Sequence, residues 1–143
     1  MKKLTTLIAT IGLAAVISGC TSEPSVATAT KLDLNKVCSV EQSGIKNVIE
    51  TAKTYNVIAQ AKGLEFRRLS VNNSDLIASV EEAIKTGAKE VNPKDFKGKT
   101  SKTKLETNFA AERACRFAVV ALIQSEEAKS TWRNAVPGDG LQY

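Results

Sequence analysis

Apolar residues recur at intervals of three and four along much of the chain, which is the spacing of one face of an α-helix. The first such segment, Ile45–Ala59, ends before Gly63, a residue suited to a left-handed helix cap. The second, Leu76–Val91, follows the turn and N-cap residues 72–74 and stops at Asn92-Pro93. The pattern therefore predicts two amphipathic helices in the first two thirds of the chain.

A third helix is expected from Leu105 to Asn134, and its middle is apolar on almost every side. That is typical of a central helix covered by others. Between the helices, residues 64–71 are expected to be extended and residues 94–104 to form an exposed loop. We therefore expect a mainly α domain with a small three-helix core. The alternative is an α+β fold with a short hairpin near residues 56–70, because residues 56–59 also have the composition of a strand.

The first twenty residues have the pattern of an export signal. Lys2 and Lys3 precede an apolar stretch, 4–17, which is shorter than the roughly 20 residues that span a bilayer. The stretch ends in Ile17-Ser18-Gly19-Cys20. This resembles the lipobox of bacterial lipoproteins, in which an aliphatic residue and two small residues precede a cysteine. The resemblance implies that residues 1–19 are a lipoprotein signal peptide and that Cys20 is lipidated and becomes the mature N-terminus.

The residues after the lipobox indicate which membrane holds the anchor and how the domain is connected to it. In lipoproteins of enteric-type bacteria, an aspartate directly after the lipidated cysteine resembles the signal for retention in the inner membrane. This chain has Thr21 at that position, so the resemblance implies an anchor in the outer membrane, at its periplasmic face. Residues 20–31 are mostly small and hydroxylated, with no apolar period, and predict a flexible tether. Residues 32–143 are then expected to form a single periplasmic domain.

Two cysteines remain once Cys20 is assigned to the lipid. An even pair in an oxidising compartment favours a disulfide between Cys38 and Cys115. Cys115 shares a helix face with apolar residues, which directs its thiol inward, toward the start of the first helix. Buried free thiols are the alternative, whereas a redox pair is disfavoured because neither cysteine belongs to a Cys-x-x-Cys motif.

Composition excludes several kinds of chemistry. The chain has no histidine, which removes His-based triads and His metal sites. A catalytic Ser–Lys dyad needs a lysine in apolar surroundings. The spacing Ser-x-x-Lys occurs only at residues 43–46 and 101–104, and neither lysine has such surroundings. Loss of residues 1–19 removes Lys2 and Lys3 and no acid, so the net charge falls from +5 to +3. We therefore expect no enzyme activity, no metal, no cofactor and no nucleic-acid partner.

Four arginines stand in apolar surroundings: Arg67 and Arg68 in the extended segment, and Arg113 and Arg116 in the third helix. The favoured interpretation is that they pair internally with Glu65, with Glu112 or with the C-terminal carboxylate, because a buried guanidinium needs such partners. The functional alternative is a cationic groove for a partner peptide or a lipid head group.

Two further groups are candidates for contact with a partner or with head groups. The loop 94–104 has a marked excess of positive charge. It is interpreted either as a solvated connector or as a contact with anionic lipid or an acidic partner. Trp132-Arg133 combines two residue types enriched in binding hot spots, with core packing of the tryptophan as the alternative. The lysines of the loop are Lys94, Lys97, Lys99, Lys102 and Lys104.

These features favour a non-enzymatic envelope lipoprotein that binds or positions a protein partner. The general build is similar to that of secretion-system pilotins, which are small helical lipoproteins with a disulfide, so a role related to secretion is included in this expectation. The alternative is an envelope-protective inhibitor or exclusion factor. Lysozyme-inhibitor-like proteins of that kind are rich in β-structure, which disfavours it. The oligomeric state is left open.

Overall fold

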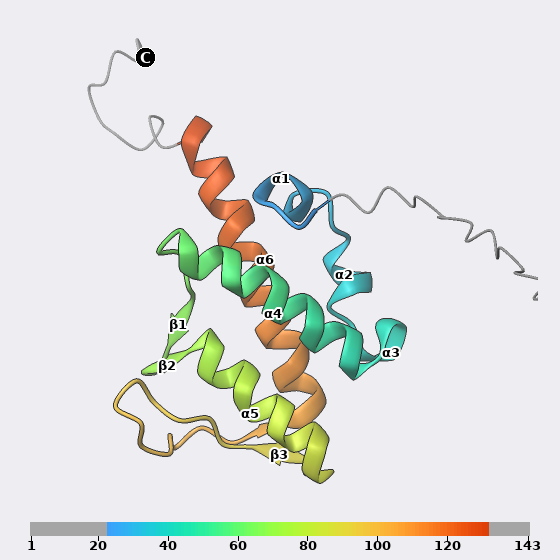
Figure 1. Ribbon diagram of the computed structural model, residues 1–143, viewed down its shortest axis with the longest axis vertical. Coiled ribbons are helices and arrows are strands. Elements are labelled where there is room, and N and C mark those ends of the chain that lie inside the picture. The colour runs from blue at the N-terminus through green and yellow to red at the C-terminus, as the bar shows by residue number, and fades with distance from the viewer. Residues whose placement is uncertain (1–22, 132–143) are drawn as a thin grey trace, which may run out of the picture.

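The computed structural model describes residues 23–131, which form a helical domain with two small antiparallel hairpins (Figure 1). This confirms the mainly helical class. A short hairpin is also present, at residues 67–72, although residues 56–59, which the alternative made a strand, are helical. The elements in chain order are α1 (Val26–Ala29), α2 (Leu34–Val37), α3 (Val40–Ser43), α4 (Ile45–Ala61), β1 (Arg67–Arg68), β2 (Val71–Asn72), α5 (Asn73–Thr86), β3 (Glu90–Val91), β4 (Leu105–Glu106) and α6 (Thr107–Thr131).

The centre of the domain is α6, as its apolar middle predicts. It packs most extensively against α4, then against α5 and α1. The face that α6 buries consists mainly of small side chains, which let the neighbouring helices approach closely. The fully buried or nearly fully buried residues on this face are Ala110, Ala111, Ala114, Cys115, Ala118, Val119 and Leu122.

The second predicted helix is shorter than its apolar pattern suggests. α5 ends at Thr86, and Gly87 closes it with φ 72°, so the prediction that it continues to Val91 is wrong. Gly87 adopts this left-handed cap without steric cost, whereas an ordinary residue would favour continuing the helix. The chain then forms β3, in which Val91 is buried and pairs with Leu105 of β4. Residues 105–106 are therefore strand, and α6 begins at Thr107.

The expected tether is partly folded. Ser25 and Thr28 form a reciprocal capping box that starts α1, and Ala29 is 0% exposed. Ala29 belongs to a buried cluster with Tyr55 of α4 and Leu122 of α6. The prediction of a flexible segment over residues 20–31 is therefore wrong for residues 25–31. A single helical turn is too short to show an apolar period, which is why the sequence pattern misses it.

The docking of α1 gives a testable result. We expect Ala29→Asp to release this segment, because an unpaired carboxylate would have to enter a buried apolar cluster. Trypsin should then cleave after Lys31 much faster than in the wild-type chain. Ala27→Asp is the matched control, since Ala27 lies in the same helix but is exposed. Equal cleavage rates in the two variants would show that α1 is not held on the domain.

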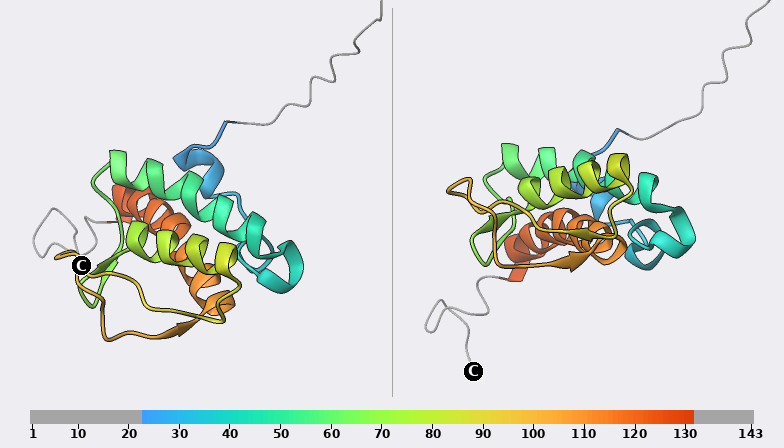
Figure 2. Two further views of the ribbon diagram at one scale, coloured as in Figure 1. Left: turned by 60° about the horizontal axis from the view of Figure 1, so that its bottom comes forward. Right: turned by 90° about the horizontal axis from the view of Figure 1, so that it is seen from below.

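The two ends of the domain carry different features. α1 lies over the carboxyl-terminal half of α6, whereas the hairpins and the loop 94–104 lie at the other end of the domain (Figures 1 and 2). The loop is exposed, as predicted, although it is not free of structure. Lys94 and Thr100 form a β-bridge, and the carboxylate Oδ1 of Asp95 accepts hydrogen bonds from the backbone N–H groups of Lys97 and Lys99, both at 2.9 Å.

Candidate functional site

The tip of the first hairpin holds an apolar side chain out in solvent. Leu69 and Ser70 connect Arg68 of β1 to its register partner Val71 of β2, with φ values of 50° and 66°. Two-residue hairpin turns with positive φ normally use asparagine or glycine, so a leucine here is conformationally unfavourable. Its side chain is also 72% exposed. Such outliers persist where the surrounding structure enforces them, and they cluster at functional positions.

The loop 94–104 supports this hairpin tip. The backbone N–H of Phe96 donates a hydrogen bond to the carbonyl of Ser70, with an N···O distance of 2.8 Å. On the other strand of the loop, the N–H of Ser101 donates to the carbonyl of Pro93, at 3.0 Å. Phe96 is 59% exposed, so the contact brings a second exposed apolar side chain close to the turn that bears Leu69.

A narrow apolar cleft lies between the first hairpin, the start of β4 and α6, and we call it the Arg cleft. Its volume is about 40 Å³, which is room for roughly one water molecule. Sites for small-molecule substrates typically enclose about 300–1,000 Å³, so this cleft admits the tip of a side chain and no more. Its apolar lining consists of Phe66, Leu69, Val71, Leu76, Pro93, Leu105 and Phe117, and its polar lining of Arg68, Asn72, Asn73, Thr103 and Arg113.

Two arginines line the cleft from different elements. The Arg113 guanidinium on α6 lies 5.1 Å from the ring centre of Phe117 and 5.9 Å from that of Phe109. Phe117 in turn stacks on Phe66, with ring centres 4.0 Å apart. Partial burial lowers the pKa of Arg113, and the positive charge of Arg68 on β1 lowers it further. The cleft therefore combines two mutually repelling cations with aromatic surface.

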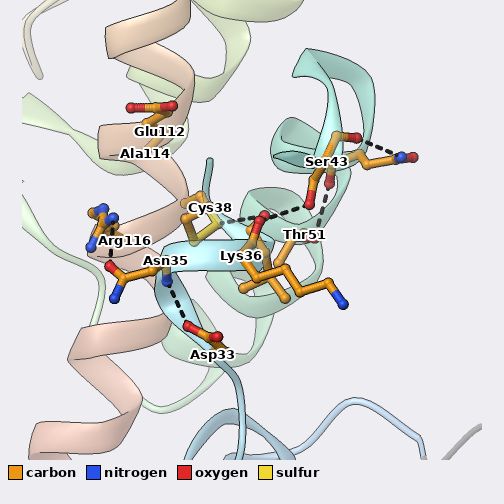
Figure 3. Close-up of a disulfide and its surroundings, with 12 residues drawn as sticks. Asp33, Asn35, Lys36, Cys38, Ser43, Thr51, Glu112, Ala114 and Arg116 are labelled. Carbon is orange, nitrogen blue, oxygen red and sulfur yellow. Dashed lines mark hydrogen bonds between the residues drawn. A yellow bond between two sulfur atoms is a disulfide. The ribbon is translucent and has the colours of Figure 1, made fainter. Parts of the chain in front are cut away.

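The expected internal pairing of the arginines is wrong within residues 23–131, where no salt bridge involves any of the four. Glu112 instead accepts a hydrogen bond from the backbone N–H of Val40, at 2.7 Å, and so caps α3. Arg116 donates to the amide oxygen of Asn35, at 3.3 Å (Figure 3). The backbone donors at helix starts outcompete the guanidinium groups for the carboxylates. The expected C-terminal carboxylate lies outside the described residues.

Glu65 joins two helices behind the hairpin. Its Oε1 accepts hydrogen bonds from the backbone N–H of Ser74, at 2.8 Å, and from the side-chain amides of Asn56 and Gln60, both at 3.2 Å. Ser74 is in the first turn of α5, so the carboxylate also faces the positive end of a helix. Burial on its own would raise the pKa of Glu65. The hydrogen bonds from Ser74, Asn56 and Gln60 outweigh burial, so the pKa lies below its ordinary value.

This lowered pKa predicts a pH-dependent contribution to stability. A carboxyl whose pKa is lower in the folded state stabilises the fold above its unfolded pKa, near 4.3, and loses that contribution as the pH falls through the folded pKa. We therefore expect Glu65→Gln to be less stable than the wild-type chain at pH 7 and the difference to shrink steadily below about pH 4. Urea unfolding at pH 7 and at pH 3 measures it, and a difference that grows in acid would contradict the assignment.

A buried amide network lies under the cleft. Asn73, 2% exposed, donates from its Nδ2 to the side-chain oxygen of Asn56 at 2.9 Å and to the backbone carbonyl of Ala114 at 3.0 Å, which links α5 to α4 and α6. The side-chain Nδ2 of Asn72 donates to Asp75, at 2.9 Å. The Oδ1 atoms of Asn72 and Asn73 are buried and accept no hydrogen bond within the described part of the chain. The roles of Asn56 and Asn73 are not predicted from the sequence, where Asn56 is a polar residue within an apolar helical face and Asn73 belongs to the turn before the second helix.

The other predicted residues have separate positions. The disulfide between Cys38 and Cys115 is present and joins α2 to α6, with a Cα–Cα distance of 5.5 Å (Figure 3). Arg67 lies on the opposite side of β1 from Arg68 and lines a different surface, with Gln60 and Glu65. The five lysines of the loop are exposed. Cys20, Trp132 and Arg133 lie outside the described residues.

Three further findings concern metal binding, membrane spanning and similarity to known proteins. Among residues 23–131, no three histidine, cysteine or carboxylate side chains are grouped so that they could hold a metal ion. No helix in this same part of the chain has both the length and the hydropathy that crossing a membrane requires. Comparison with protein-family models, with curated proteins and with solved structures finds no match to this chain. The function is therefore inferred from the residues of the site.

Proposed function

We propose that the protein is a lipid-anchored envelope protein whose domain binds a protein partner through the Arg cleft and catalyses no reaction. The observation that carries the proposal is that exposed apolar side chains lie in the cleft or next to its lining. Leu69 lines the cleft, Phe109 lies beside the Arg113 guanidinium, and the backbone of Phe96 is hydrogen-bonded to Ser70. Leu69, Phe96 and Phe109 are 72%, 59% and 52% exposed. Leaving such side chains in water is unfavourable, and exposed apolar groups bordered by charge mark interaction sites.

Two further features support this function. A disulfide between fully buried cysteines is typical of proteins that mature in an oxidising compartment, which agrees with export by the lipobox signal. The small volume of the Arg cleft favours contact with a macromolecule over enclosure of a small substrate. The anchor is proposed to be the lipid on Cys20, at the periplasmic face of the outer membrane, and a role in secretion is one form that the partner's function could take.

The anchor is tested by substitution at the lipobox cysteine. Labelled palmitate should enter the wild-type chain and should not enter Cys20→Ser, which should leave the detergent phase. Thr21→Ser is the matched control, because it changes the next residue and keeps the thiol. Equal labelling of Cys20→Ser and the wild-type chain would contradict the anchor.

The partner is tested by purifying the tagged chain from detergent-solubilised envelopes. We expect one dominant protein with the wild-type chain and its loss with Leu69→Asp, since aspartate tolerates positive φ better than leucine and the hairpin should persist. Val57→Asp is the control, because Val57 is 63% exposed on α4, which does not line the cleft. Equal recovery with all three chains would contradict binding at the cleft. Capture of a soluble hydrolase that the chain inhibits would favour the alternative function of an inhibitor.

A further inference from the structure

Arg68 and Arg113 face one cleft and neither forms a salt bridge with an acid among the described residues. Arg68 is exposed on β1, whereas Arg113 is half-buried and held against two aromatic rings. A guanidinium group presents a planar fork of donors that matches a carboxylate, so two of them at one cleft favour an anionic ligand. The apolar lining between them favours a ligand that carries an apolar group beside its charge.

The polar part of the cleft lining is held in place by hydrogen bonds. Asn72 and Asn73 line the cleft, and the Oδ1 of each is buried without a hydrogen-bond donor in the described part of the chain. The amide orientations are fixed, because the Nδ2 atoms already donate to Asp75, to Asn56 and to the carbonyl of Ala114. These oxygens have almost no accessible surface, so the two asparagines shape the wall of the cleft and a ligand in it does not contact their Oδ1 atoms.

We propose that the Arg cleft binds an acidic segment of a protein partner, in which a carboxylate stands next to an apolar side chain. The proposal rests on the proposed function and names the chemistry of the partner. The carboxylate meets Arg68 and Arg113, and the tip of the apolar side chain enters the cleft. The exposed lysines of the loop 94–104, which is bound to the hairpin tip through Phe96 and Ser70, add positive potential that attracts such a segment.

The position of the cleft favours a protein segment over a lipid. Residues 21–24 separate Cys20 from Ser25, the N-cap of α1, and the five steps from Cys20 to Ser25 extend at most about 17 Å. A lipid on Cys20 would therefore hold the α1 end of the domain nearest the membrane. The loop 94–104 and the hairpin tip lie at the other end (Figure 2).

The test places a photo-crosslinker beside the cleft in cells that produce the full chain. Phe96 and Phe109 are each replaced by p-benzoylphenylalanine, which keeps an aromatic ring at an exposed position, and Val57 receives it as the control. The crosslinked segment is identified by mass spectrometry. We expect Phe96 and Phe109, and not Val57, to crosslink to a protein segment that contains aspartate or glutamate beside an aliphatic or aromatic residue.

Charge reversal provides the matched comparison. Arg68→Glu should lower the crosslinking yield about tenfold or more, which corresponds to about 1.4 kcal/mol of binding free energy. Arg67→Glu makes the same change at the neighbouring exposed residue of β1, on the face away from the cleft, and should change the yield less than about twofold. Unchanged melting temperatures would show that both variants fold.

Several results would overturn the inference. They are a crosslinked segment that is neutral or basic, a crosslink to phospholipid, and an equal loss of yield with Arg67→Glu and Arg68→Glu. If the envelope purification yields a partner but neither Phe96 nor Phe109 crosslinks to it, the inference fails while a partner-binding function stands. If neither experiment yields a protein, the proposed function itself is wrong.

Discussion

The Cys38→Ala/Cys115→Ala variant should unfold about 15–20 °C below the oxidised wild-type protein. The two cysteines are 77 positions apart, and a crosslink that closes so long a loop restricts the unfolded chain by roughly 4 kcal/mol in the chain-entropy model. In a domain of this size, each kcal/mol corresponds to about 4–5 °C of melting temperature. The bond also joins α2 to the central helix, where both cysteines are fully buried. Thermal unfolding followed by circular dichroism measures the effect.

Reduction provides the internal control for this prediction. Dithiothreitol should lower the melting temperature of the wild-type chain toward that of the double variant and leave the double variant unchanged. A double variant that melts within about 3 °C of the oxidised wild-type chain would show that the disulfide contributes little to stability.

Asn73→Ala should destabilise the domain by about 2–3 kcal/mol, or about 10 °C in melting temperature. Its amide donates to Asn56 and to the carbonyl of Ala114, so the substitution leaves the buried oxygen of Asn56 without this donor and opens a small space between three helices. The buried Oδ1 that has no donor is removed at the same time, which keeps the loss below that of a fully paired group. Urea unfolding gives the free energy directly.

Asn47→Ala is the matched control for Asn73→Ala. Asn47 lies on α4, is exposed, and donates from its side chain to the carbonyl of Ser43 on the protein's surface. Its replacement should change the free energy of unfolding by less than about 0.5 kcal/mol. Similar losses for both variants would contradict a structural role for the buried network.

The sequence predicted the long elements well because each has a full apolar face. α4 and α6 lie where the period indicates, and Cys115 points inward as its neighbours on the helix require. α1, α2 and α3 were missed because four residues are barely one helical turn. The end of α5 was misplaced because the apolar Val91 fits the helical period and is equally buried as part of a strand.

The Arg cleft was less predictable, because its lining comes from segments between residues 66 and 117. From the sequence, Arg68 and Arg113 stand out as arginines in apolar segments, but they were predicted to form ion pairs with acids nearby in the chain. Nearness in sequence did not decide the pairing, since Glu65 turns to the start of α5 and Glu112 to the start of α3. The positive φ at Leu69 and the burial of the Asn72 and Asn73 side-chain oxygens without a donor depend on backbone geometry. The pattern of apolar residues gives no information about that geometry.

Hydrogen exchange tests the central claim most directly, by comparing the protein alone with the same protein in its purified complex. We expect slower exchange of backbone amides in residues 66–72 and 93–105, and no change over the exposed side of α4 around Val57. Protection confined to α1 and α4, with the hairpin and the loop unchanged, would contradict binding at the Arg cleft.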